Sequence, residues 1–267
     1  MTKLNQFLIY DELPIWSAPF GLMLLDTIRI RKHMNILDIG SGSGFPMLEI
    51  AERAGDSCKI YGIDPSADAY SMIRKKMELK NISNAEIIKT YAETLSFPND
   101  FFHMVVANNG LNNVKDEKQV LSKCFRVCKK GAQVVLTMNL PHTMIEFYEL
   151  LEEIFMEKKK FISVDRMRVH IHEKRKSVEY WKELILQTGF SVNDMNVDGF
   201  KLHYADGTSF FNHYFIKTAF LPSWKKFATV NELKLVETRM NKIAKTSGEF
   251  SVSIPFVCFD LKKNKSS

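Results

Sequence analysis

Short apolar runs alternate with amphipathic, helix-like stretches between residues 35 and 139. We expect strands near 35–40, 59–63, 85–89, 103–107 and 133–137, and helices near 46–54, 67–80 and 116–128. Strands that alternate with helices form a parallel sheet covered on both faces. The chain has 267 residues, which suffices for one large domain or two small ones.

A glycine-rich loop follows the first predicted strand and leads into a helix. Gly40, Gly42 and Gly44 alternate there with serines, so backbone N–H groups can approach a ligand closely. The dinucleotide-binding fingerprint would place its third glycine at position 45, where this chain has Phe45. Asp64 follows the second predicted strand and can accept hydrogen bonds from two ribose hydroxyls. An acid at that place suits NAD as well as S-adenosylmethionine.

Five ordered segments between residues 34 and 139 resemble the class I S-adenosylmethionine-dependent methyltransferases. The resemblance is to the small-molecule group related to the ubiquinone/menaquinone-biosynthesis C-methyltransferases (UbiE-like). The segments are the glycine loop, Asp64, Ala92–Asp100, Phe102–Asn109 and Phe125–Ala132. The resemblance implies an α/β fold: a doubly wound, seven-stranded, mostly parallel, Rossmann-like sheet with a helical insertion before the last strand.

The same resemblance implies S-adenosylmethionine as cofactor, with S-adenosylhomocysteine as its product. The glycine loop would surround the aminocarboxypropyl part, Asp64 would bind the ribose, and Ala92 and Glu93 would lie near the adenine. Asn108 and Asn109 would lie beside the methionine portion. The complete set of expected cofactor-binding residues is Asp38, Gly40, Ser41, Gly42, Gly44, Asp64, Pro65, Ala92, Glu93, Asn108 and Asn109.

Three positions depart from the family pattern, and at one of them Ser96 replaces a proline, which we interpret as a loop detail. Tyr91 stands where many relatives have an aspartate that reaches the adenine amine. His103 stands where relatives usually have an aspartate at the start of the fourth strand. We interpret His103 as a histidine at a strand edge rather than as a catalytic group.

Substrate specificity is expected outside the matched core. We divide the chain into residues 1–33, which would cover the cofactor and substrate, a core of 34–206 and 249–262, and a helical, lid-like insertion at 207–248. The insertion is rich in aromatic residues, and a dimerisation or packing role is the alternative to a lid. Residues that could contact an apolar or aromatic substrate are Tyr10, Trp16, His142, Tyr148, His213 and Trp224.

The expected reaction is in-line methyl transfer to a small-molecule acceptor, in which orientation supplies the main catalytic effect. No residue in the sequence stands out as a general base. Asn108-Asn109-Gly110-Leu111 follows the fourth strand in place of Asn-Pro-Pro-Tyr, which argues against methylation of exocyclic amines in nucleic acids. The alternatives are an RNA or protein methyltransferase and a non-catalytic protein that binds S-adenosylmethionine.

The formal net charge is +6 and the isoelectric point is about 9.0. Basic residues gather loosely at 158–182 and 217–245, but acids are interspersed, which favours solvated helix faces over an anionic substrate or RNA. The four cysteines form no Cys-x-x-Cys pair, so we expect buried thiols. With neither a signal peptide nor a membrane span, we expect a cytoplasmic monomer or homodimer that does not bind nucleic acid.

Three smaller expectations concern the second half of the chain. His170 and His172 alternate with apolar residues, as on a strand, and no metal site with His203 is expected. Pro255 in the last predicted strand indicates an edge or a bulge. Lys262–Ser267 reads as a frayed tail.

Overall fold

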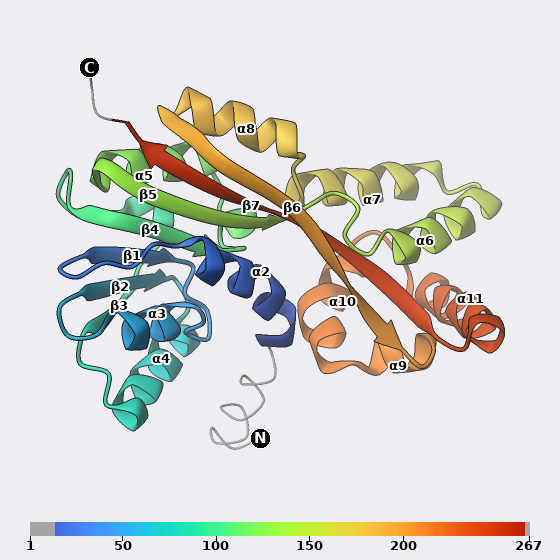
Figure 1. Cartoon of the computed structure of the whole chain (residues 1–267). Helices are drawn as coiled ribbons and strands as arrows, with labels where there is room; N and C mark the ends of the chain where they lie inside the picture. The colour runs from blue at the N-terminus through green and yellow to red at the C-terminus, as the bar shows by residue number, and fades with distance from the viewer. Residues whose placement is uncertain (1–13, 265–267) are drawn as a thin grey trace. The chain divides into compact units, whose positions relative to one another are not determined.

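The computed structural model describes residues 14–264. Within this part of the chain, one seven-stranded sheet has the order β3-β2-β1-β4-β5-β7-β6 (Figure 1). The winding reverses between β1 and β4, where open α/β sheets bind their ligands. The strands are β1 (Asn35–Ile39), β2 (Lys59–Asp64), β3 (Ala85–Lys89), β4 (Phe102–Asn108), β5 (Cys128–Asn139), β6 (Phe190–Tyr204) and β7 (Phe250–Lys263).

The first five strands are parallel: β1 pairs with β2 and β4, β2 with β3, and β4 with β5. The last two strands are antiparallel to each other. Ser191 Oγ donates to Lys262 O at 3.2 Å, and Asn193 Nδ2 donates to Asp260 Oδ2 at 2.7 Å, so rising numbers in β6 face falling numbers in β7. The opposed arrows are visible in Figure 1. The predicted seven-stranded, mostly parallel α/β fold is confirmed.

The chain forms two compact units. The first comprises Met1–Met138, Ser177–Val197 and Phe256–Ser267, and the second comprises Asn139–Lys176 and Asp198–Pro255. The described helices of the first unit are α2 (Pro14–Thr27), α3 (Met47–Ala54), α4 (Ala67–Lys80), η1 (Ala92–Thr94), η2 (Leu111–Asn113), α5 (Glu117–Val127) and α8 (Val178–Gln187). Those of the second are α6 (Ile145–Glu157), α7 (Phe161–Lys174), α9 (Gly207–Asn212), η3 (Ile216–Phe220), α10 (Leu221–Trp224) and α11 (Val230–Ser247).

Apolar side chains on both faces of the parallel strands build the core of the first unit. Ile36 and Val106 pack with Leu24 of α2 and Ile50 of α3 in one buried cluster. Leu37, the neighbour of Ile36, is equally buried, and successive strand residues point to opposite faces. Burial of both faces explains why these strands read as continuous apolar runs in the sequence.

An aromatic cluster builds the core of the second unit. Phe147 of α6, Phe210 of α9 and Trp224 of α10 are fully buried, and the rings of Phe147 and Trp224 stack with centroids 3.9 Å apart. Residues 207–248 therefore contain α9, η3, α10 and α11, which form the expected helical insertion between β6 and β7. The buried rings of Phe210 and Trp224 in this insertion stabilise the second unit itself.

The prediction that His170 and His172 lie on a strand is wrong, because both belong to helix α7. Val164 and Met167, which are three residues apart, are the buried side chains of this helix. The four-residue alternation around the histidines was too short to outweigh this longer helical spacing.

Pro255 was expected to mark an edge strand or a bulge, and the prediction of an edge strand is wrong. β7 lies between β5 and β6, so Pro255 belongs to an inner strand. β5 ends at Asn139, and the next residue, Leu140, donates its N–H to Pro255 O at 2.9 Å. Leu140 O accepts instead from Thr143 N at 3.1 Å and from Thr143 Oγ1 at 2.7 Å, so the missing N–H of Pro255 leaves no acceptor there without a donor.

Two further boundaries differ from the sequence reading. The helix expected to end at Cys128 ends at Val127, and β5 begins directly at Cys128. Lys262 and Lys263, assigned to a frayed tail, are the last residues of β7, and Lys263 is buried. The prediction for the cysteines is confirmed, since Cys58, Cys124, Cys128 and Cys258 are buried free thiols.

Candidate functional site

The glycine loop turns sharply away from the end of β1. The φ angles of Gly40, Gly42 and Gly44 are 75°, 52° and 100°, which lie in the left-handed region that favours glycine. The N–H groups of Gly40 and Ser41 both donate to Ile63 O, at 2.9 and 3.1 Å, and anchor the loop to β2. Gly42 is exposed, and a Cβ there would meet only Gly40 O within 4 Å, at 3.9 Å. The space above Gly42 is thus free for a ligand, although its N–H already donates to Asp64 Oδ2.

Asp38 is a fully buried acid on β1, two residues before Gly40. Neither carboxylate oxygen has a hydrogen-bond partner among residues 14–264. Burial raises the pKa of Asp38 to about 7; the nearby Ser41 hydroxyl opposes this shift, and the charge of Asp64 adds to it. A buried carboxylate without a partner is costly, and a cationic group from a ligand would remove that cost.

Asp64, the last residue of β2, is fixed between the glycine loop and α4. Its Oδ2 accepts from Gly42 N at 3.0 Å and its Oδ1 accepts from Ser66 N at 2.8 Å. Ser66 in turn caps α4, because its Oγ accepts from Ala69 N at 3.2 Å. A carboxylate has about four lone-pair positions, so acceptor capacity is left for the hydroxyls of a ligand. Pro65, the next residue, is exposed.

The segment after β3 places Ala92 and Glu93 in the short helix η1. Ala92 is buried, and Glu93 Oε1 accepts from Lys115 N at 2.8 Å. Tyr91, the departure from the family pattern, is 58% exposed. Arg126 of α5 braces the chain that follows, since it donates to Leu95 O at 3.0 Å and to Phe97 O at 2.7 Å.

Asn108 ends β4 beside the glycine loop and connects three elements. Its Nδ2 donates to Ser17 O of α2 at 3.1 Å, and its Oδ1 accepts from Thr137 Oγ1 of β5 at 2.9 Å. Asn109 has a φ of 58°, and its N–H donates to Thr137 O at 2.9 Å. Thr137 is fully buried, and sequence reasoning did not single it out. A hydroxyl directly after the apolar run 134–136 was the available signal.

Ten of the eleven residues expected around the cofactor end or follow the strands β1 to β4, and Asp38 is the last residue but one of β1. The carboxyl ends of parallel strands meet at one edge of a sheet, and these strands flank the point where the winding reverses. The site presents the carboxylate of Asp38, the partly used carboxylate of Asp64 and the exposed loop at Gly42. These groups suit a ligand with a cationic group and vicinal hydroxyls.

A family model described as a methyltransferase domain matches residues 30–189, which is more than half of the chain. The chain belongs to the methyltransferase domain family. This confirms the family expected from the glycine loop, the class I S-adenosylmethionine-dependent methyltransferases.

The curated relatives include demethylmenaquinone methyltransferases. The one from Geobacillus sp. is 30% identical over 123 residues, which is 46% of this chain and 53% of the relative. The one from Listeria monocytogenes is 34% identical over 107 residues, or 40% of this chain and 45% of the relative. The chain thus matches about half the length of these relatives.

Two solved structures show how far the fold is shared. The YcgJ protein from Bacillus subtilis has a TM-score of 0.62 at 17% identity, covering 92% of this chain and 98% of that one. Phosphoethanolamine N-methyltransferase 2 from Haemonchus contortus, in complex with S-adenosyl-L-methionine, has a TM-score of 0.56 at 18% identity. The match covers 92% of this chain and 52% of that chain.

The residues expected to contact substrate fall into two groups in this methyltransferase family member. In the first unit, Trp16 is half-buried in α2, with its ring centroid 6.0 Å from that of Phe20. Tyr10 lies outside the described residues. In the second unit, His142 and His213 are exposed, whereas Tyr148 and Trp224 are buried.

Tyr148 and Trp224 are joined by a hydrogen bond within the second unit. Trp224 Nε1 donates to Tyr148 Oη at 3.0 Å, and the buried Arg175 donates to the same oxygen at 3.3 Å. The structure thus brings these two predicted residues together in a packed core. Contact with a substrate stays a prediction for all six residues.

Two further features of residues 14–264 bear on the kind of site and protein. No group of three or more His, Cys, Asp and Glu side chains there is placed to hold a metal ion. No helix in the same range is both long and apolar enough to cross a membrane.

Proposed function

We propose that this chain transfers a methyl group from S-adenosylmethionine to a small-molecule acceptor. The observation that carries the proposal is the fully buried, unpartnered carboxylate of Asp38 beside an open glycine loop. S-adenosylmethionine has an ammonium group that would pair with this carboxylate. Membership of the methyltransferase domain family supports the reaction class.

The residues at the edge of the sheet fit the remaining parts of the cofactor. Asp64 keeps acceptor capacity for the ribose hydroxyls, and the exposed Gly42 peptide would face the aminocarboxypropyl part. Ala92 and Glu93 would border the adenine. Asn108 and Asn109 would lie beside the methionine portion, held there by Thr137.

The bound cofactor supplies a methyl group that is already activated on a sulfonium. The chain's own contribution is alignment, and good orientation can be worth about 7–11 kcal/mol. Asn108 is suited to this task because Ser17 and Thr137 fix both ends of its amide. A general base adds rate only when the acceptor has to lose a proton, and the site offers no evident one.

For the acceptor we propose an apolar or aromatic small molecule of the quinol type. The demethylmenaquinone methyltransferases among the relatives support this class. The half-buried Trp16 on α2, next to Asn108's partner Ser17, is the described aromatic residue best placed to contact it. We further propose a cytoplasmic monomer or homodimer, with residues 207–248 as lid or interface.

Calorimetric titration tests the cofactor. We expect micromolar binding of S-adenosylmethionine and S-adenosylhomocysteine, and at least about tenfold weaker binding to Asp64→Asn, which loses a charged acceptor. Asp68→Asn makes the same change at an exposed position in the first turn of α4 and should bind as the wild type does. Absence of binding, or equal effects of the two substitutions, would refute the proposed site.

Product formation tests the acceptor. We expect S-adenosylhomocysteine to accumulate when a short-chain demethylmenaquinol is added, and not with ethanolamine phosphate or RNA. Turnover with RNA or a protein alone would favour the alternative methyltransferases. Tight cofactor binding without turnover of any acceptor class would favour a non-catalytic binding protein.

A further inference from the structure

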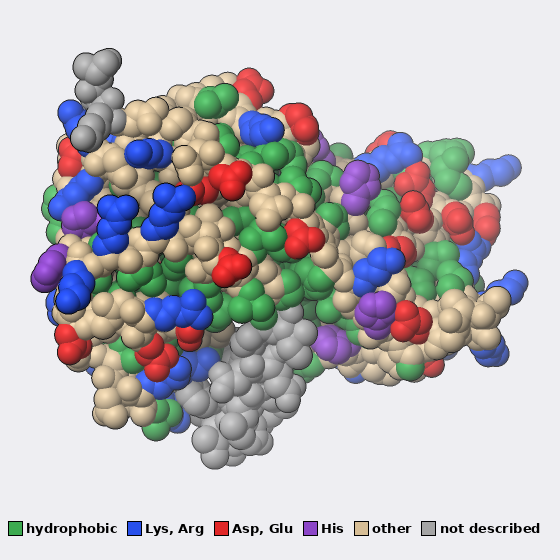
Figure 2. All heavy atoms as spheres, viewed as in Figure 1, with side chains coloured by type: hydrophobic (Ala, Val, Ile, Leu, Met, Phe, Trp, Pro, Cys, Tyr) green, Lys and Arg blue, Asp and Glu red, His purple; other side chains and the backbone are tan. Residues whose placement is uncertain are grey.

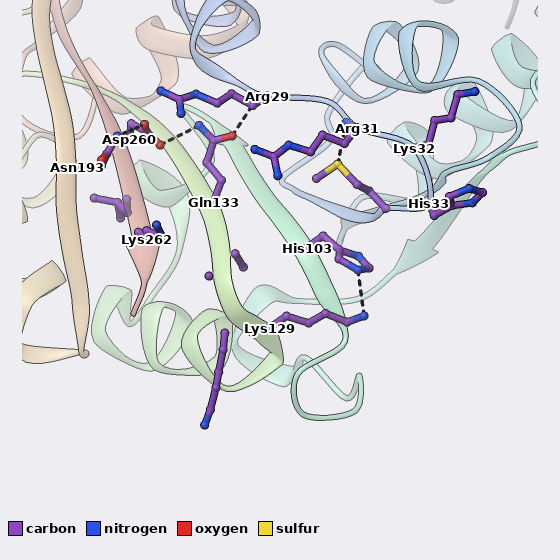
Figure 3. Close-up of a pocket in the computed structure, with 15 residues that line it drawn as sticks. Arg29, Arg31, Lys32, His33, His103, Lys129, Gln133, Asn193, Asp260 and Lys262 are labelled. Carbon is purple, nitrogen blue, oxygen red and sulfur yellow. Dashed lines mark hydrogen bonds between the residues drawn. The ribbon is translucent and has the colours of Figure 1, made fainter. Parts of the chain in front are cut away.

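A basic groove of about 350 Å³ lies in the first unit, away from the glycine loop. It is formed where β1, β4 and β5 begin, whereas the cofactor site lies where β1 to β4 end (Figure 3). Its lining combines the segment before β1, the start of β5 and the end of β7. The cations that line it are Arg29, Arg31, Lys32, Lys129, Lys130 and Lys262.

The groove holds most of the protein's excess positive charge. Its six cations face one lining acid, Asp260, which leaves +5 when both lining histidines, His33 and His103, are neutral. The whole chain has a net charge of +6. Figure 2 shows Lys, Arg and His side chains gathered on this side of the first unit. Like charges confined in a concave site raise the local potential and attract anions.

The positive charge of the groove's cations is not neutralised by ion pairs. Among residues 14–264, none of the six forms an ion pair with an acid. Asp260 is held instead by neutral amides: Oδ1 accepts from Gln133 Nε2 at 2.8 Å, and Oδ2 accepts from Asn193 Nδ2 at 2.7 Å. Gln133 Oε1 also accepts from Arg29 N at 2.9 Å, which fixes the backbone on this wall of the groove.

Two donors face each other on the opposite wall. His103 Nδ1 accepts the backbone N–H of Asn35 at 2.9 Å, so in the neutral ring the hydrogen lies on Nε2. Burial and the charge of Lys129 lower the pKa of His103, which favours that neutral ring. Lys129 Nζ lies 3.0 Å from Nε2, as Figure 3 shows, and a charged ammonium also has only hydrogens to offer. An anionic oxygen beside both atoms would accept from each.

We propose that this groove is a second binding site, which takes a ligand with a diphosphate group. The uncompensated charge matches a multiply charged anion better than a single carboxylate. The paired donors of His103 and Lys129 would hold one phosphate oxygen, and the arginines before β1 can bind another phosphate in bidentate fashion. The site needs no part of the cofactor edge, so it is independent of the proposed methyl transfer.

The test uses the whole chain and inorganic pyrophosphate in calorimetric titration. We expect saturable binding that weakens as salt is raised, and at least about tenfold weaker binding to the double variant Arg31→Gln/Lys129→Gln. The matched control is Lys158→Gln/Lys159→Gln, which removes the same charge from exposed positions outside the groove and should bind as the wild type does. An ADP titration with S-adenosylhomocysteine at saturation, which fills the proposed cofactor site, distinguishes sources. Tighter binding than pyrophosphate then indicates a nucleotide, and equal binding indicates the diphosphate alone.

A second variant separates ligand binding from structure. Lys129→Met removes one of the two opposed donors, so it should raise the melting temperature of the free protein while weakening pyrophosphate binding. A variant that lowers both would mean that Lys129 only supports the fold. The proposal is overturned if pyrophosphate does not bind, or if the groove and control double variants bind it equally. Binding of RNA or of anionic vesicles without pyrophosphate binding would overturn it as well.

Discussion

At the scale of single residues, Asp38 carries the proposed function, and its burial makes stability depend on pH. Its pKa is about 7 in the folded protein and 3.8 in the unfolded reference, so the folded state keeps the proton between these values. The contribution of Asp38 to stability therefore falls as pH rises through this range, by up to about 4 kcal/mol in full. We expect Asp38→Asn to lack this fall when unfolding free energies are measured from about pH 5 to about pH 7.5.

The same substitution should act in the opposite direction on the cofactor. Without the carboxylate, S-adenosylmethionine should bind at least about tenfold more weakly, and wild-type binding should release a proton near pH 7. Titrations in buffers of different ionisation enthalpy measure that proton. Asp68→Asn, on the exposed side of α4, serves as the control for both readouts. Parallel pH profiles of wild type and Asp38→Asn would show that Asp38 does not titrate in this range.

At the scale of elements, the N-terminus of α11 is defined by side-chain capping. Thr229 Oγ1 accepts from Glu232 N at 3.3 Å, and Glu232 Oε2 accepts from Thr229 N at 2.8 Å, which forms a complete capping box. Thr229→Ala should lower the unfolding free energy by about 1–2 kcal/mol. Thr238→Ala, at an exposed site within the same helix, should change it by less than about 0.5 kcal/mol. Thermal unfolding measures both, and equal losses would contradict a capping role.

The elements that the sequence predicted best are those with a simple period or a special backbone. The ranges 67–80 and 85–89 agree with α4 and β3, and the three glycines form the loop expected after β1, with positive φ angles. Helix α7 was missed because four alternating residues around His170 imitate a strand. Pro255 misled because the missing N–H excludes a ladder bond on one side only, and β5 ends beside it.

The residues of the candidate site were easier to predict from the sequence than the residues that hold them in place. A motif fixes Asp38 and Asp64 by spacing, whereas Thr137 acts on Asn108 through pairing of β4 with β5, which the sequence does not display. The basic groove was also not predicted from the sequence, because its residues come together only in the folded sheet. Its cations come from three short segments, while the sequence draws attention to denser basic runs at 158–182 and 217–245.

At the scale of the whole molecule, a buried lysine at the end of β7 joins this strand to neighbouring elements. Lys263 Nζ donates to Asp100 Oδ1 at 2.9 Å, Phe125 O at 2.8 Å and Cys128 O at 2.7 Å. Its ammonium also lies 4.7 Å from the centroid of the Phe125 ring. One side chain thus joins the end of β7 to the loop before β4 and to the junction of α5 and β5.

These contacts predict a large effect from a residue that sequence reasoning placed in a tail. Lys263→Met keeps the apolar stem but leaves two backbone carbonyls without this donor, so the unfolding free energy should fall by about 2–4 kcal/mol. Lys262→Met, at the exposed neighbouring position, should change it by less than about 0.5 kcal/mol. Urea denaturation measures both variants. A loss of stability for Lys263→Met no larger than that for Lys262→Met would mean that the contacts of Lys263 do not stabilise the fold.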